Sequence, residues 1–163
     1  MSVISSFAKK LALARELKIG AGRLEILRQR VIIVPVQLFE SMIVRSQNDP
    51  EYARGLYLDL KKAVSEFALS LDRKYKVRGS KLADVLVKLT EMNGYGKAEV
   101  IKDDRKNRIA IFRVNDLPSV NLKGKVKGHA DIYWSGVLAG GVSAVYGEDM
   151  DCVETKCQLN GSG

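Results

Sequence analysis

The feature that most constrains this chain is a glycine-spaced apolar stretch close to its C-terminal end. From Trp134 to Tyr146 nearly every residue is apolar or small, and three glycines recur at helical spacing, Gly136, Gly140 and Gly141. Glycine costs a helix about 1 kcal/mol relative to alanine. A helix that keeps three glycines on a turn-spaced row is therefore expected to have another element packed closely against that face.

A long amphipathic helix is expected in the middle of the chain. It starts at Asn48-Asp49-Pro50-Glu51, where a side-chain oxygen can cap free backbone N–H groups and proline suits the first turn. The helix should run from Pro50 to about Tyr75, with one apolar face formed by Leu56, Leu60, Ala63, Val64, Phe67 and Leu71. Its length makes it the expected central packing element.

A second amphipathic helix is expected at the N-terminus, over about residues 2–18. Its apolar residues repeat at three- and four-residue spacing and so share one stripe: Val3, Phe7, Leu11, Ala14 and Leu17. Such a stripe packs either on the chain's own core or on a second copy of the chain, as a dimerisation arm. Gly20-Ala21-Gly22 then breaks the helical pattern.

The remaining segments do not alternate as strands and helices do in a parallel sheet. Arg23 to Val34 is expected to form one bent strand or a hairpin that turns at Arg28-Gln29. The other expected elements are helices over Val36–Arg45 and Lys81–Met92, and strands over Lys97–Lys102, Arg108–Val114 and Met150–Leu159. Both faces of Arg108–Val114 are largely apolar, so this strand is expected inside a sheet. The order favours a single α+β domain over residues 1–163, with an antiparallel sheet of about four to five strands packed against several helices.

Length and composition predict one hydrophobic core, and the two cysteines are consistent with a reducing compartment. A chain of 163 residues with 46% hydrophobic content can bury one core, and a second domain is not expected. No apolar run reaches the ~20 residues that span a bilayer, and the first ten residues lack the order of a signal peptide. Cys152 and Cys157 are expected to remain thiols. We therefore expect no membrane span and a cytoplasmic location.

The net charge of +8 favours a solvated basic surface over a nucleic-acid site. Lys123, Lys125 and Lys127 form a basic loop that could contact phosphates, but no aromatic residues lie between them and no recognition motif follows. The sequence also shows no recognisable set of catalytic residues, since it has one histidine and no glycine-rich phosphate loop. We identify no catalytic residues, and the sequence implies no nucleotide or redox cofactor.

The C-terminal third nevertheless resembles a known signature. Its spacing is similar to that of the 4-vinyl reductase domain family, on Gly136, Gly140, Gly147, Glu154-Thr155-Lys156-Cys157 and Gly161. That family is named from a bacteriochlorophyll biosynthesis protein and also supplies effector-sensing domains of transcription activators that respond to aromatic hydrocarbons. Its fold is shared with heme-based nitric-oxide sensors and with subunits of the TRAPP tethering complex. The resemblance implies an α+β fold of this kind.

The resemblance also implies a candidate zinc site. Glu154 and Cys157 match the family's Glu-x-x-Cys, and Asp131 falls where the family has a further cysteine, with Cys152 and His129 close enough in sequence to complete the set. The family's last cysteine would fall after Gly163. The alternative is a buried, inert Cys157 with Glu154 in a salt bridge to a basic residue such as Lys156.

For function, the resemblance favours a sensor of a small hydrocarbon-like or aromatic ligand. An apolar pocket is expected between the long helix, an inner strand and the glycine helix, near Tyr57, Phe67, Phe112 and Trp134. Alternatively, Trp134 is a residue of the hydrophobic core and does not contact a ligand. Two other functions stay open, a homodimeric scaffold protein of the TRAPP kind and an accessory protein of tetrapyrrole metabolism.

Overall fold

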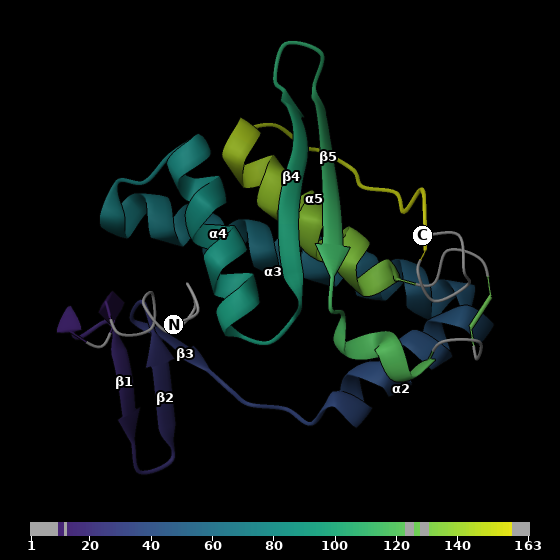
Figure 1. The fold of residues 1–163 in the computed structure, drawn as a ribbon, viewed down its shortest axis with the longest axis horizontal. Coiled ribbons are helices and arrows are strands. Elements are labelled where there is room, and N and C mark those ends of the chain that lie inside the picture. The colour runs from purple at the N-terminus through teal and green to yellow at the C-terminus, as the bar shows by residue number, and fades with distance from the viewer. Residues whose placement is uncertain (1–9, 12, 123–125, 128–130, 158–163) are drawn as a thin grey trace.

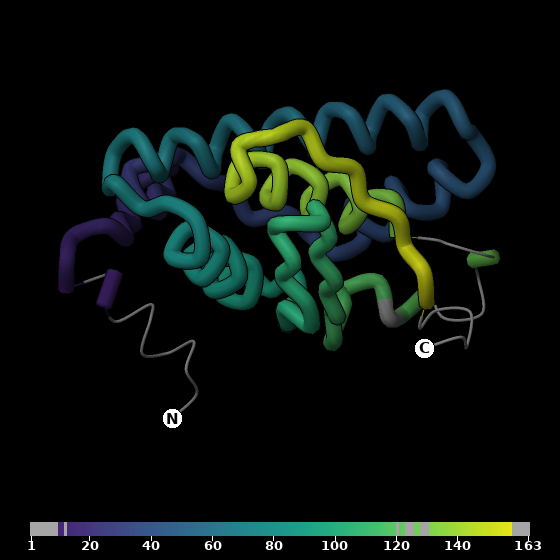
Figure 2. The backbone as a smooth tube through the Cα atoms, turned by 90° about the horizontal axis from the view of Figure 1, so that it is seen from above, coloured from purple at the N-terminus to yellow at the C-terminus, as the bar shows by residue number. Residues whose placement is uncertain are grey.

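The long helix α3 (Pro50–Tyr75) runs along one side of the computed structural model, which describes residues 10–11, 13–122, 126–127 and 131–157 (Figure 2). Its start is the predicted one, because the Asp49 carboxylate accepts a hydrogen bond from the Tyr52 N–H at 2.9 Å and Pro50 occupies the first turn. It ends where Lys76 turns into the left-handed region at φ 55°. Both predicted bounds of this helix are confirmed.

Helix α5 (Ile132–Tyr146) packs along α3 through two of the three predicted glycines. A Cβ atom added to Gly136 would lie 2.8 Å from the Tyr57 carbonyl oxygen, and one added to Gly140 would overlap the Lys61 carbonyl oxygen more severely. Gly141 faces the other way, and its Cβ would meet Leu86 of helix α4 (Ser80–Met92) at an ordinary 3.7 Å. The expectation of a closely packed neighbour is therefore confirmed, with α3 as that neighbour.

The side of α5 that faces away from α3 is covered by α4 (Ser80–Met92) and by an antiparallel ribbon of β4 (Lys97–Asp104) and β5 (Ile109–Asn115) (Figures 1 and 2). The ribbon has two strands, so β5 is not the internal strand that its two apolar faces predicted. Ile109 and Ile111 on its outer face are 44% and 47% exposed. The inner face, which includes Phe112, lies toward α5 and creates the site described below.

The N-terminal part forms a separate three-stranded meander of β1 (Leu17–Gly20), β2 (Arg23–Ile26) and β3 (Gln29–Val31) (Figure 1). The described strands are thus divided between two antiparallel sheets, which confirms the α+β class but not one continuous sheet. The helix predicted over residues 2–18 ends too late, because Arg15 adopts a left-handed φ of 58° and Leu17 already belongs to β1. Residues 2–9 and 12 of that prediction lie outside the described part.

The alternative of a hairpin over residues 23–34 is the correct one. Leu27 and Arg28 form its turn with φ values of 52° and 57°, a pair of left-handed residues that matches the twist of a tight hairpin. The turn lies one residue before the predicted one. Leu27 is 7% exposed, so burial of its side chain offsets the steric cost of its left-handed backbone.

Helix α2 (Val36–Asn48) and the 3-10 turn η1 (Pro118–Leu122) complete the described elements. Apolar side chains gather in two clusters. One joins the N-terminal hairpin to α3 and α4 through Leu11, Ile26, Leu27, Ala68, Leu71, Leu82 and Leu89, and the other consists of Phe39, Ile43, Leu122, Val126 and Cys157. None of the helices in the described part is long and apolar enough to cross a membrane.

The strand predicted over Met150–Leu159 is wrong for its described part. Residues 150–157 make no strand pairing with β5, and residues 158–159 lie outside the described part. We call residues 148–157 the C-terminal segment. It returns over α5 after Gly147, whose left-handed φ of 74° ends that helix.

Candidate functional site

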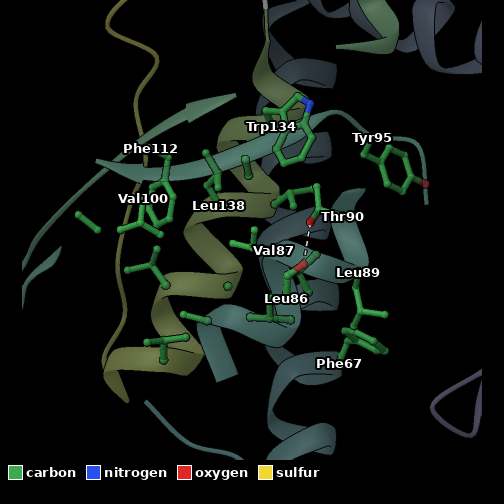
Figure 3. A pocket seen from close by; sticks show the side chains of 18 of the residues that line it. Phe67, Leu86, Val87, Leu89, Thr90, Tyr95, Val100, Phe112, Trp134 and Leu138 are labelled. Atoms are coloured by element: carbon green, nitrogen blue, oxygen red, sulfur yellow. Dashed lines mark hydrogen bonds between the residues drawn. The ribbon is translucent and has the colours of Figure 1, made fainter. Parts of the chain in front are cut away.

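A pocket of about 230 Å³ lies between α4, α5 and the β4–β5 ribbon, and we call it the α4–α5 pocket (Figure 3). A dry cavity of about 150 Å³ in another protein is large enough to bind benzene, so this pocket has room for one substituted ring. Its wall is mostly apolar, and includes Phe67, Leu86, Val87, Phe112, Trp134 and Leu138.

The polar groups of the pocket wall are largely occupied by one another. The Thr90 hydroxyl donates to the Leu86 carbonyl at 2.9 Å, and the Tyr146 hydroxyl donates to Asp103 at 2.7 Å. Burial raises the pKa of Tyr146 to about 12, and the hydrogen bond to Asp103 adds to this, so that hydroxyl stays neutral. The buried indole N–H of Trp134 has no hydrogen-bond partner among the described residues. The pocket therefore suits a neutral, mainly apolar molecule.

The structure brings together three of the four aromatic residues predicted to lie near a ligand. Phe67 of α3, Phe112 of β5 and Trp134 of α5 all line the α4–α5 pocket. Tyr57 does not, because it lies on the part of α3 that contacts Gly136 and its hydroxyl reaches the C-terminal segment instead. Sequence reasoning missed the contribution of α4, whose Leu86 and Val87 form much of the opposite wall.

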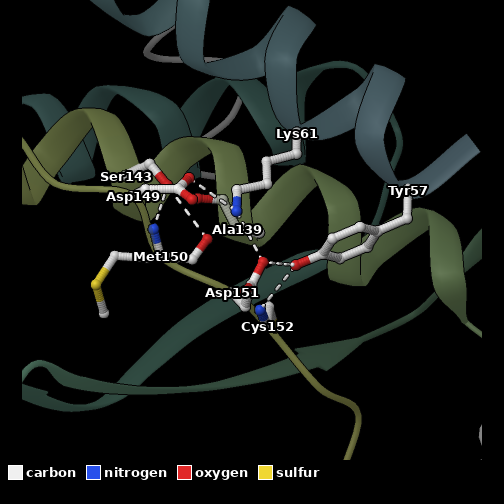
Figure 4. A network of polar contacts seen from close by, with 8 residues as sticks. All are labelled: Tyr57, Lys61, Ala139, Ser143, Asp149, Met150, Asp151 and Cys152. Carbon is white, nitrogen blue, oxygen red and sulfur yellow. Dashed lines mark hydrogen bonds and ion pairs between the residues drawn. The ribbon is translucent and has the colours of Figure 1, made fainter. Parts of the chain in front are cut away.

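Tyr57 belongs to a polar network that ties the C-terminal segment to α3 (Figure 4). Its hydroxyl donates to Asp151 at 2.8 Å and accepts from the Cys152 N–H at 3.1 Å. One turn along α3, the Lys61 ammonium contacts Asp149 at 2.8 Å and Asp151 at 2.7 Å. Burial lowers the pKa of Lys61, but its hydrogen bonds to the two carboxylates outweigh that and raise it to about 12. Lys61 is therefore charged at neutral pH.

This network was detectable in the sequence. Tyr57 and Lys61 are four residues apart on a helix, and Asp149 and Asp151 are two apart in an extended segment, so each pair lies on one face. We expect Lys61→Met to lower the free energy of unfolding by about 1 kcal/mol, because it removes both ion pairs. The loss is no larger because the two carboxylates are largely solvated. Amide hydrogen exchange at Asp151 and Cys152 should accelerate in the same variant.

The matched control for that prediction is Lys62→Met, because Lys62 is the exposed neighbour on α3 and makes no ion pair within the described residues. Urea denaturation should show a change of less than about 0.5 kcal/mol for it. Equal effects of the two substitutions would contradict the tethering role of Lys61.

A second cavity of about 400 Å³ lies between β5, α5 and the C-terminal segment, and we call it the C-terminal cleft. Asp131 lines it and is 3% exposed. One carboxylate oxygen, Oδ1, caps α5 by accepting the Trp134 N–H at 3.3 Å, and the Asp131 N–H donates to Glu154 at 3.1 Å. The other oxygen, Oδ2, makes no hydrogen bond of ordinary geometry among the described residues, but the buried Ser119 hydroxyl lies close enough to this carboxyl to act as a donor and to lower its pKa. Burial raises the pKa of Asp131 to about 6, and the nearby charge of Glu154 contributes in the same direction.

The predicted zinc ligands are only partly brought together. Asp131 and Glu154 are adjacent, whereas Cys157 is buried in the cluster of Phe39 and Ile43. Cys152 is half-buried, and burial raises the pKa of its thiol. His129 lies outside the described residues, and those that are described include no group of three side chains able to hold a metal. The described residues thus supply a carboxylate pair rather than a full set of zinc ligands, and the zinc site stays a prediction.

The fold is similar to that of a solved sensory domain. The structure described as the phenol-responsive sensory domain of the transcription activator PoxR with phenol matches at a TM-score of 0.74 and 12% sequence identity, over 98% of this chain and 85% of that one. At this identity the likeness establishes the fold alone. Neither a model of a known protein family nor a curated protein matches the chain. Membership of the 4-vinyl reductase family therefore stays a prediction.

Proposed function

We propose that this chain is a sensory domain that binds one small, neutral, mainly apolar organic molecule in the α4–α5 pocket. The observation that carries the proposal is the pocket itself, a cavity of about 230 Å³ with apolar walls in a fold shared with a phenol-responsive sensory domain. Three helices and a strand ribbon contribute to its wall, so a bound molecule would contact α3, α4, α5 and β5 at once.

The affinity of the pocket for such a small ligand has a physical upper limit. Small ligands gain at most about 1.5 kcal/mol per non-hydrogen atom, and desolvating apolar surface contributes about 25 cal/mol per Å². Phenol and toluene are suitable first probes, because they are close in size and differ only in that toluene has a methyl group where phenol has its hydroxyl. Trp134 is the only tryptophan and lies in the pocket wall, so its fluorescence reports occupancy directly.

We expect Gly141→Leu to abolish binding of whichever probe the unsubstituted chain takes. Gly141 lines the pocket, and a Cβ atom added there meets only Leu86, at 3.7 Å, so a leucine side chain can enter the cavity without displacing backbone at its Cβ. Calorimetric titration and Trp134 fluorescence should both lose their response. The matched control is Gly55→Leu, the same substitution at an exposed site of α3 with nothing within 4 Å, which should bind as the unsubstituted chain does.

Two results would contradict the pocket as the binding site. One is unchanged binding in Gly141→Leu when circular dichroism shows that variant to be folded. The other is equal loss of binding in Gly141→Leu and Gly55→Leu, since the second change is remote from the pocket.

A second candidate function, self-association, is favoured by the apolar surface of the N-terminal part. Ile19 in β1 is 80% exposed, and Ile32 and Ile33, which follow β3 of the same small sheet, are 79% and 87% exposed, which is unusual for large aliphatic side chains. We propose that this surface pairs with a second copy of the chain. Analytical ultracentrifugation should show a dimer that Ile33→Lys dissociates, and a monomer at all accessible concentrations would contradict pairing.

A further inference from the structure

A wall at the contact of β5 with α5 separates the α4–α5 pocket from the C-terminal cleft. Leu86 and Val87 of α4 line the pocket and not the cleft, whereas residues 150–155 of the C-terminal segment line the cleft and not the pocket. The residues that line both cavities are Ala110 and Phe112 of β5, and Trp134, Leu138 and Val142 of α5. The side chains of this shared wall therefore decide whether the two cavities are separate or joined.

Phe112 is the large side chain that β5 contributes to the shared wall. The other shared residue of β5, Ala110, has a single methyl group, so the Phe112 ring provides most of the wall on this side. Phe112 lies on the inner face of β5, because side chains alternate along a strand and its neighbour Ile111 is exposed on the outer face. Figure 3 shows the Phe112 ring among the apolar side chains of the pocket.

The volume of the α4–α5 pocket suits one aromatic ring but not two. A dry cavity of about 150 Å³ in another protein binds benzene. In the same proportion to the number of carbon atoms, toluene needs about 180 Å³, and diphenylmethane, which is toluene with a second ring, needs about 330 Å³. The pocket has about 230 Å³, and the cleft beyond the shared wall has about 400 Å³. A second ring would have to pass Phe112 and enter the cleft.

We propose that Phe112 determines the size of ligand that the α4–α5 pocket accepts, because its ring closes the pocket against the C-terminal cleft and restricts binding to one-ring molecules. This inference rests on the proposed function, since it specifies the class of ligand for the same pocket. Extra carbon atoms pressed against a packed wall force side chains out of their preferred rotamers, which weakens binding. Without the Phe112 ring, the second ring of a larger ligand could lie against Leu138 in the cleft.

The test compares toluene with diphenylmethane in titrations of the full chain, followed by Trp134 fluorescence. The unsubstituted chain should bind toluene at least about tenfold more tightly than diphenylmethane. Phe112→Val should bind diphenylmethane at least about tenfold more tightly than the unsubstituted chain does, because the second ring can enter the cleft. Valine suits a β-strand, and circular dichroism verifies the fold. Leu138→Ala opens the same wall from α5 and should also strengthen the binding of diphenylmethane.

The matched control is Phe67→Val, the same substitution at a residue that lines the pocket but not the cleft. It removes the same number of carbon atoms from the pocket wall and leaves the shared wall in place. Its affinity for diphenylmethane should therefore stay within about threefold of that of the unsubstituted chain.

Three results would overturn the inference. The first is that the unsubstituted chain binds diphenylmethane as tightly as it binds toluene. The second is that neither Phe112→Val nor Leu138→Ala gives a folded chain with a higher affinity for diphenylmethane. The third is an equal gain in Phe67→Val and Phe112→Val, which would mean that added volume alone is decisive. The proposed function is judged separately, because it fails if the unsubstituted chain binds neither toluene nor phenol.

Discussion

Gly140→Ala is expected to lower the free energy of unfolding by about 3 kcal/mol, among the largest effects of any single-methyl change in this chain. The added carbon would overlap the Lys61 carbonyl oxygen and approach Val64 Cβ to 3.0 Å. Neither neighbour can rotate away, because one is main chain and the other is the first side-chain carbon of a helical residue. Relief therefore requires α3 and α5 to separate along their contact.

The matched control for Gly140→Ala is Gly55→Ala. Gly55 is an exposed residue in α3 with no atom within 4 Å of an added Cβ, so alanine should raise stability by about 0.5–1 kcal/mol through helix propensity. Urea denaturation measures both changes. For a chain of this length, 1 kcal/mol corresponds to about 2–4 °C in melting temperature. A neutral Gly140→Ala would mean that α3 and α5 are not held at the observed separation.

A second large effect is expected from pH, through Asp131. Burial raises the pKa of this carboxyl from its ordinary 3.8 to about 6, so the folded chain binds more protons than the unfolded chain between these values. Stability should therefore fall as the pH rises through this window, by about 3 kcal/mol in total for the Asp131 contribution. Asp131→Asn removes the charge but keeps the cap, so it should remove this slope and stabilise the folded chain at neutral pH.

The measurement is the free energy of unfolding in urea at a series of pH values, compared between the unsubstituted chain and Asp131→Asn in the presence of a chelator. Asp84→Asn is the control, because Asp84 is exposed and makes no hydrogen bond or ion pair within the described residues. Parallel pH profiles for the unsubstituted chain and Asp131→Asn would show that Asp131 is either solvated or paired in the folded chain.

Helices with strong local signals were predictable from the sequence, and α3 is the clearest case. Its Asp49 cap, first-turn proline and apolar face are encoded within the helix itself. The end of the N-terminal helix was not predictable, because Arg15 adopts a left-handed φ although it is neither glycine nor asparagine. The strand predicted over the C-terminal segment was wrong for a related reason. Its alternation of residues is that of an extended chain, but side chains of α3 hold it, and no strand in the described part of the chain pairs with it.

The candidate site was predictable in its residue types but not in its geometry. Phe67, Phe112 and Trp134 could be predicted as pocket residues because they lie on apolar faces of helices and a strand with clear sequence signals. Tyr57 was misplaced because α3 is contacted on two sides, and periodicity alone does not say which side faces a cavity. The burial of Asp131 could not be anticipated, since it depends on how β5, α5 and the C-terminal segment pack together.

The most direct test of the pocket as a ligand site is methyl NMR during titration of the chain with phenol and toluene. Methyl signals of Leu86, Val87 and Leu138 should shift most, because these residues line the α4–α5 pocket. Signals of Ile26 and Ile43 should stay in place, because both are buried in other parts of the core. An absence of shifts with either compound, or shifts confined to residues away from α4, α5 and β5, would contradict the proposed sensory function.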